Sequence, residues 1–255
     1  MAANEPGQPD TTHALISRNL SVPSSALAIG AHPDDVEFGC GATLAKWAAA
    51  GCVVHHLVLT DGSKGTWNPD ADVPALIVTR QHEQREAARR LGGAQVGEVV
   101  FLGRVDGELQ NDLPLRGEVA RVIRELRPQV ILAHDPWKRY RLHPDHREAG
   151  LLACDGIVAA RDPHFFKEHR LASHRPETLL LWEADTVHHA EDVTGFIDTK
   201  LHALAAHESQ FESTMKAVDE EQMGAFRERI TTRLSGLGAQ YGFGAAEVFA
   251  RISDL

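Results

Sequence analysis

The tripeptide His-Pro-Asp occurs twice in this 255-residue chain, at residues 32–34 and 143–145, and each copy follows an apolar run. Proline fits the first turn of a helix, because its φ angle is preset and no N–H is needed there. Each copy therefore predicts a strand, a tight loop and the start of a helix. Repetition of that unit is typical of an α/β fold with a parallel sheet.

Apolar runs alternate with helical patterns along the chain. We expect strands at 26–30, 53–60, 99–102, 130–133, 178–182 and 248–252. We expect helices at 36–50, 74–91, 116–127, 195–218 and 220–234. This alternation predicts an α/β fold with a Rossmann-like, mainly parallel sheet that is flanked by helices. Ligands of such sheets bind beyond the carboxyl ends of the strands, where both His-Pro-Asp loops are expected.

Composition limits the class of protein and its partners. With 43% hydrophobic and 24% charged residues, the chain is expected to form one globular domain over 25–255, preceded by a flexible tail at 1–24. A formal net charge of −10 argues against nucleic acid and anionic membranes as partners, and no apolar stretch is long enough to span a bilayer. Three cysteines without a C-x-x-C motif suit a reducing compartment, so we expect a cytoplasmic protein. A homo-oligomer is compatible with these features.

The two motifs together predict a metal site. Helical spacing places His32 with Asp35, and His143 with His146, on one side of a helix start. Imidazole and carboxylate are ligands that Zn²⁺ prefers, and a catalytic zinc takes three protein ligands and leaves one position open. Two histidines and one aspartate would satisfy that number, although spacing alone does not choose between Asp34 and Asp35. Fe²⁺ or another divalent cation is an alternative to zinc.

Such a site has the equipment for amide hydrolysis by an activated water. Asp34 could accept the proton of the water and pass it to the departing amine. His143 could stabilise the developing oxyanion or act as a general acid. Asp145 could orient His143 or an imidazole that binds the metal.

Further motifs extend the pattern between and beyond the two loops. They are R-x-x-E-x-x-x-A-A-x-x-L-G at 80–92, Phe-Leu-Gly at 101–103, Asp-Gly at 106–107 and, as a weaker echo, Ala-His-Glu-Ser-Gln at 206–210. With both His-Pro-Asp motifs, they resemble the PIG-L/LmbE-like zinc deacetylases. The resemblance implies an LmbE-like fold and metal-dependent removal of an acetyl group from a small N-acetylglucosamine-type molecule.

The resemblance also implies roles for individual residues. It assigns His32, Asp35 and His146 as metal ligands, Asp34 as the base and His143 as the electrostatic or acid partner. For substrate binding it points to Asp106, Ser63 and Lys64. Arg141 is a further candidate, because it occupies the position where some members have a tyrosine, and Tyr140 precedes it.

Two other functions remain open at this point. The same metal site could serve an amidase that acts on a thiol conjugate or another acylated amine. A non-hydrolytic Rossmann module that binds a nucleotide is suggested by Gly39-x-Gly41. That motif lacks its third glycine, however, and two carboxylates at the helix start would repel a pyrophosphate.

Overall fold

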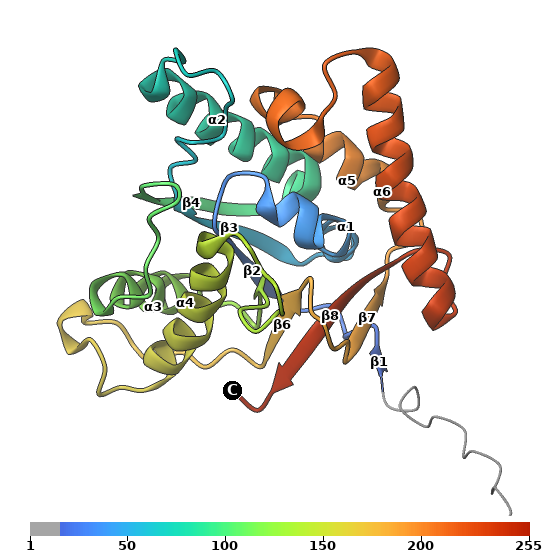
Figure 1. Ribbon diagram of the computed structural model, residues 1–255. Helices are drawn as coiled ribbons and strands as arrows, with labels where there is room; N and C mark the ends of the chain where they lie inside the picture. The colour runs from blue at the N-terminus through green and yellow to red at the C-terminus, as the bar shows by residue number, and fades with distance from the viewer. Residues whose placement is uncertain (1–15) are drawn as a thin grey trace, which may run out of the picture.

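The computed structural model describes residues 16–255, which form one α/β unit around an eight-stranded sheet (Figure 1). The strand order is β1-β7-β8-β6-β5-β2-β3-β4. Five neighbouring strands are parallel to one another and extend to the edge formed by β4: β2 (Ser25–Gly30), β3 (Val53–Thr60), β4 (Val96–Arg104), β5 (Val130–His134) and β6 (Thr178–Trp182). The remaining strands are β1 (Ser17–Arg18), β7 (His189–Asp192) and β8 (Ala246–Ser253), and β8 runs antiparallel to both β6 and β7.

Helices cover both faces of the sheet (Figure 1). They are α1 (Asp35–Ala49), α2 (Val73–Gly92), α3 (Leu113–Leu126), α4 (Pro144–Arg161), α5 (Ile197–Leu204) and α6 (Glu220–Tyr241). Alternation along each strand divides the core, because successive side chains point to opposite faces. In β2, Ala26 and Ala28 pack with α1, whereas Leu27 and Ile29 pack with α3 and α4.

The order of the parallel strands creates a crevice at one edge of the sheet. The chain leaves β2 through α1 to β3 on one side, and it leaves β5 through α4 to β6 on the other side. Because β2 and β5 are neighbours, the loops that follow them diverge from a single point, which is the usual ligand position in such sheets. Both His-Pro-Asp motifs lie there.

The predicted fold class is confirmed, but some elements differ. The predicted helix at 195–218 is wrong, because α5 ends at Leu204 and short 3-10 and π turns follow at 208–210 and 211–215. Helix α6 continues to Tyr241, beyond the predicted end at 234, and stops at Gly242 with a φ of 76°. The short strands β1 and β7 were not predicted.

The amino-terminal tail predicted over 1–24 is only partly described. Residues 1–15 lie outside the described part of the chain, so the prediction for them is not examined by the structure. Ser17 and Arg18 pair with His189 and Ala190, so the sheet includes residues ahead of the predicted boundary at 25. No helix among residues 16–255 has the length and hydropathy needed to cross a bilayer.

Candidate active site

A cavity of about 460 Å³ opens beyond the carboxyl ends of β2 and β5. Its lining includes His32, Asp34 and Asp35 from the first His-Pro-Asp loop and His143 and His146 from the second. Residues that lie far apart in the sequence are thus brought to one place by the topology of the sheet.

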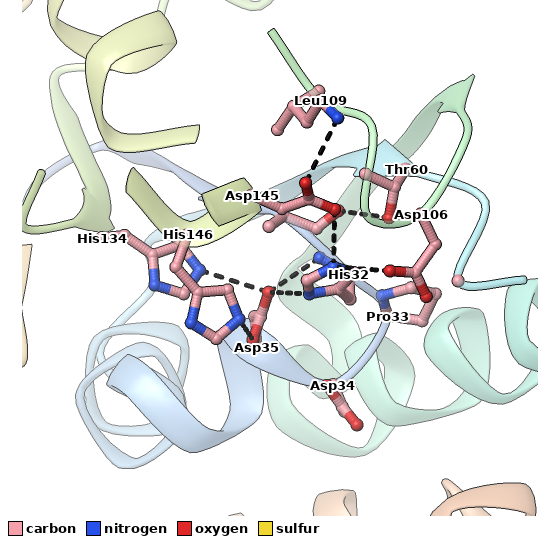
Figure 2. A network of polar contacts seen from close by, with 12 residues as sticks. His32, Pro33, Asp34, Asp35, Thr60, Asp106, Leu109, His134, Asp145 and His146 are labelled. Carbon is pink, nitrogen blue, oxygen red and sulfur yellow. Dashed lines mark hydrogen bonds and ion pairs between the residues drawn. The ribbon is translucent and has the colours of Figure 1, made fainter. Parts of the chain in front are cut away.

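His32, Asp35 and His146 converge on one another (Figure 2). Nδ1 of His32 lies 3.2 Å from Oδ2 of Asp35, and Nε2 of His146 lies 3.2 Å from Oδ1 of the same carboxylate. One potential ligand atom from each residue lies within 4.8 Å of those of the other two. The spacing and the donor types fit a single divalent cation.

The second ring nitrogen of His32 is held by two carboxylates. Nε2 lies 3.0 Å from Oδ2 of Asp145 and 3.1 Å from Oδ1 of Asp106. Burial acts to lower the pKa of His32, but its bonds to Asp106, Asp145 and Asp35 outweigh burial and raise the pKa well above its usual value. Ionised carboxylates only accept, so both ring nitrogens face acceptors: Nε2 faces Asp145 and Asp106, and Nδ1 faces Asp35. If a metal replaced the proton on Nδ1, the proton on Nε2 would keep its carboxylate partners and hold the ring in its orientation.

Asp145 and Asp106 are themselves fixed by backbone donors. Asp145 accepts hydrogen bonds from the N–H groups of Gly107, at 2.6 Å, and Leu109, at 3.2 Å. Oδ2 of Asp106 accepts the N–H of Lys64 at 3.1 Å. Of the two partners predicted for Asp145, the structure pairs it with the imidazole of His32.

A family model described as PIG-L, GlcNAc-PI de-N-acetylase, matches residues 27–155, which contain all of these side chains. The chain belongs to the PIG-L family. It is 34% identical over 188 residues to a diacetylchitobiose deacetylase of Thermococcus kodakarensis. The matched region covers 72% of this chain and 69% of that enzyme. Its structure also resembles that of the N,N'-diacetylchitobiose deacetylase from Pyrococcus horikoshii, with a TM-score of 0.81 and 27% identity over 91% of this chain and 84% of the other.

A second type of relative acts on a different glycoside. The chain is 30% identical over 205 residues to a 1D-myo-inositol 2-acetamido-2-deoxy-alpha-D-glucopyranoside deacetylase of Catenulispora acidiphila, over 67% of this chain. The match spans 62% of the length of that enzyme. These PIG-L relatives are therefore named for substrates that differ in the group attached to the sugar.

Asp34 in this PIG-L family protein occupies a strained backbone position. Its φ of 99° lies in the left-handed region, which is uncommon for residues other than glycine. Its N–H donates to Oε1 of Gln84 at 2.8 Å, and Arg80 donates to the carbonyl of the preceding Pro33 at 2.6 Å. Burial raises the pKa of Asp34 to about 6, although the charge of Arg80, 3.5 Å from Oδ2, acts to lower it. A carboxyl with that pKa is suited to exchange protons near neutral pH.

Gln84, which accepts the N–H of Asp34, belongs to a buried polar network. Nε2 of Gln84 donates to Oε1 of Glu37 at 2.8 Å, and Nε2 of His207 lies 3.3 Å from Oε2 of Glu37. Gln84, Glu37 and His207 have no exposed surface. Burial lowers the pKa of His207, but Glu37 outweighs that effect and the pKa rises above its usual value. His207, from the 206–210 motif, thus belongs to the network that holds the Asp34 backbone through Gln84.

His134 was missed by the sequence analysis. Nε1 of Trp182, which can only donate, bonds to Nδ1 of His134 at 3.0 Å. The proton of the neutral ring is therefore on Nε2, which lies 3.2 Å from Oδ2 of Asp35 (Figure 2). Burial lowers the pKa of His134 to about 4, so the ring is neutral at pH 7. One feature of the sequence could have identified His134: it is the last residue of a buried strand, at the end of the sheet where ligands bind.

His143 lies beside His32 and His146 at the exposed side of the cavity. Its ring stacks on His146 with a centroid distance of 4.7 Å and meets the edge of His32 at 4.6 Å. Burial, followed by the charges of His32 and His146, lowers the pKa of His143. A neutral ring in this position can donate a hydrogen bond from one nitrogen.

The four predicted substrate-binding residues lie in different surroundings. Asp106 and Lys64 line the cavity, whereas Ser63 and Arg141 are not among its described lining residues. The N–H of Ser63 bonds to Asp61 at 2.9 Å. The side chain of Arg141 is 5% exposed, donates to Glu183 at 3.0 Å and lies 3.4 Å from Nδ1 of His134. Ser63 and Arg141 therefore contact other residues of the protein and do not face the cavity. Tyr140, which precedes Arg141, is 90% exposed.

The glycines that suggested a nucleotide site have a different role. Gly39 lies inside α1, and a Cβ there would lie 2.5 Å from Cδ2 of Trp182. Glycine thus permits close packing of α1 on β6. The helix start that would hold a phosphate contains Asp34 and Asp35, which argues against a nucleotide.

Proposed function

We propose that this protein is a metal-dependent deacetylase that hydrolyses the acetamide of a small N-acetylglucosamine-type glycoside to acetate and a free amine. The observation that carries the proposal is the convergence of His32, Asp35 and His146 beside the buried carboxyl of Asp34. The relatives named for diacetylchitobiose and for a GlcNAc-inositol compound support the substrate class.

Nδ1 of His32, Nε2 of His146 and the carboxylate of Asp35 would hold the metal. Zn²⁺ is the metal we propose, and Fe²⁺ or another divalent cation suits the same donors. When bound, the metal would lower the pKa of a water molecule and polarise the acetamide carbonyl. His134 holds Asp35 in place, and Asp145 together with Asp106 holds His32.

Asp34 is the proposed general base. Its carboxylate takes a proton from the attacking water and returns it to the sugar nitrogen as the C–N bond breaks. His143 is the proposed oxyanion partner, and its neutral ring donates a hydrogen bond to the carbonyl oxygen as negative charge develops. Asp145 acts through the orientation of His32 and does not contact the substrate.

The four predicted substrate-binding residues would position the sugar. Asp106 and Lys64 are proposed to contact its hydroxyl groups, because both line the cavity. Ser63 and Arg141 would act indirectly, by fixing the loops at 61–64 and 134–141. Free, largely buried thiols at Cys40, Cys52 and Cys154 support a reducing, cytoplasmic compartment.

The test is hydrolysis of methyl N-acetylglucosaminide and diacetylchitobiose, with acetate and free amine measured together. Equal amounts of both products, lost after chelation and restored by Zn²⁺, are expected. Release of a different acid from a thiol conjugate, without acetate from either sugar, would favour the amidase alternative.

A further inference from the structure

A second cavity, of about 230 Å³, adjoins the active-site cavity. It lies among α1, α6, β8 and the segment after β6, and Figure 1 shows α6 running beside α1 and α5. Phe38, Glu183 and Arg233 line both cavities. The two cavities therefore share part of their walls, which places the second cavity next to any ligand in the first.

The wall of the second cavity is mainly apolar. Ile230, Leu234 and Leu237 line it from α6, and this spacing places them on one face of the helix. Phe38 and Val187 complete the apolar surface on the opposite side.

The charged groups deep in this cavity already satisfy each other. Lys200 donates to Glu247 at 2.6 Å and to the carbonyl of Phe38 at 2.8 Å. The carboxylate of Glu247 also accepts the N–H groups of Ala42, at 3.1 Å, and Thr43, at 2.7 Å. The pair therefore offers little free hydrogen-bonding capacity to a polar ligand.

Arg233 stands at the boundary between the two cavities. Within residues 16–255 its side chain forms no hydrogen bond or ion pair, although a guanidinium carries five donors. It can donate to oxygen atoms of a sugar in the active site while its aliphatic stem borders the apolar wall.

We propose that the second cavity is a subsite for an apolar aglycone, so that the substrates of this protein are N-acetylglucosaminides with an alkyl or aryl group. This inference rests on the proposed deacetylase function. The sugar occupies the metal site, Arg233 contacts oxygen atoms at the junction, and the apolar group packs on Phe38 and the Ile230, Leu234 and Leu237 face. A polar aglycone, such as a second sugar, gains nothing from that surface.

The direct test compares kcat/KM for methyl, hexyl and phenyl N-acetylglucosaminides with the metal-loaded protein. One fully buried methylene is worth about fourfold in binding. We expect the hexyl and phenyl compounds to exceed the methyl compound by roughly tenfold or more, chiefly through KM. Equal values for all three would overturn the subsite but keep the deacetylase. No acetate from any of them would instead remove the proposed function itself.

Variants of α6 test whether the preference for the hexyl over the methyl compound depends on the second cavity. Leu237→Glu places a charge on the apolar wall and should reduce the ratio of hexyl to methyl kcat/KM to about one, while Leu237→Ala should reduce it partly and is less disruptive to folding. Thr232→Glu adds the same charge to an exposed position of α6 that does not line the cavity, and it should keep the wild-type ratio. An unchanged ratio in both Leu237 variants would contradict the assignment.

A third comparison separates the aglycone from the acyl group. Methyl glucosaminides carrying N-acetyl and N-hexanoyl groups differ only at the acyl chain. We expect the longer acyl chain to give no gain. A gain of tenfold for the hexanoyl compound, with none for the hexyl glycoside, would overturn the aglycone assignment.

Discussion

Nε2 of His134 lies 3.2 Å from Oδ2 of Asp35, and the hydrogen bond from Trp182 to Nδ1 places the proton of His134 on that nitrogen. The ring therefore supports the carboxylate without carrying a charge of its own. Partners of this kind, which orient a metal ligand, typically contribute 10-fold to 100-fold to metal affinity.

Replacement of His134 should weaken metal binding. We expect His134→Phe to raise the Kd for Zn²⁺ by roughly 10-fold to 100-fold, because Asp35 loses the imidazole whose Nε2 lies 3.2 Å from its carboxylate. Competition with a chromophoric chelator measures this value. His82→Phe, at an exposed histidine of α2, should leave the Kd unchanged. Equal affinity of wild type and His134→Phe would show that Asp35 is positioned without His134.

Replacement of Asp34, the proposed base, should lower turnover without loss of the metal. Asp34→Asn keeps the three metal ligands and should lower kcat by about 10²-fold to 10⁴-fold with the metal retained. His146→Ala removes a ligand and should lose metal as well as activity. Metal content by atomic emission, measured on the same samples as acetate release, distinguishes the two variants. Equal loss of metal from both would contradict the separate roles of Asp34 and Asp35.

The rate should depend on the ionisation of Asp34. Burial raises the pKa of this group to about 6, and a base must be ionised to accept a proton, so kcat/KM should rise with pH through about 6. Because the charge of Arg80 acts to lower that pKa, Arg80→Gln should move the acidic limb to higher pH. Arg85→Gln, an exposed neighbour on α2, is the matched control. A pH profile that is identical in all three proteins would exclude Asp34 as the titrating group.

The buried pair of Lys200 and Glu247 should be important for stability. Both side chains are 3% exposed, so removal of one partner leaves an uncompensated charge in the core. Lys200→Met should lower the free energy of unfolding by about 3–5 kcal/mol, as measured by urea denaturation. Addition of Glu247→Gln should restore part of the loss, since the unpaired charge is removed. A double variant that is less stable than Lys200→Met would mean that the carboxylate is needed mainly to accept the N–H groups of α1.

The parts of the molecule that could be predicted from the sequence are those whose structure depends on neighbouring residues. The strand at 53–60 and the start of α4 at Pro144 depend on apolar runs and on proline, which act over a few residues. The two His-Pro-Asp loops share one edge because parallel strands bring their carboxyl ends together. The choice of Asp35 over Asp34 as a metal ligand came from the family resemblance and stays a prediction.

The missed features depend on contacts between distant segments. His134 gains its role only through Trp182 and Asp35, and nothing near it in the sequence marks either partner. The predicted helix at 195–218 ends at Leu204, and the turn that follows carries His207 to its contact with Glu37. Arg141 looked available to substrate, but its partner Glu183 lies on another loop. Periodicity and spacing do not report such pairings.

Acetate release as a function of bound metal decides whether this protein is a metal-dependent deacetylase. Chelated protein would be titrated with Zn²⁺, and acetate release from an N-acetylglucosaminide would be plotted against metal content. We expect activity that is absent without metal, rises in proportion to occupancy and saturates at one ion per chain. Full activity in metal-free protein, or one bound ion per chain with no acetate from any N-acetylglucosaminide, would contradict it.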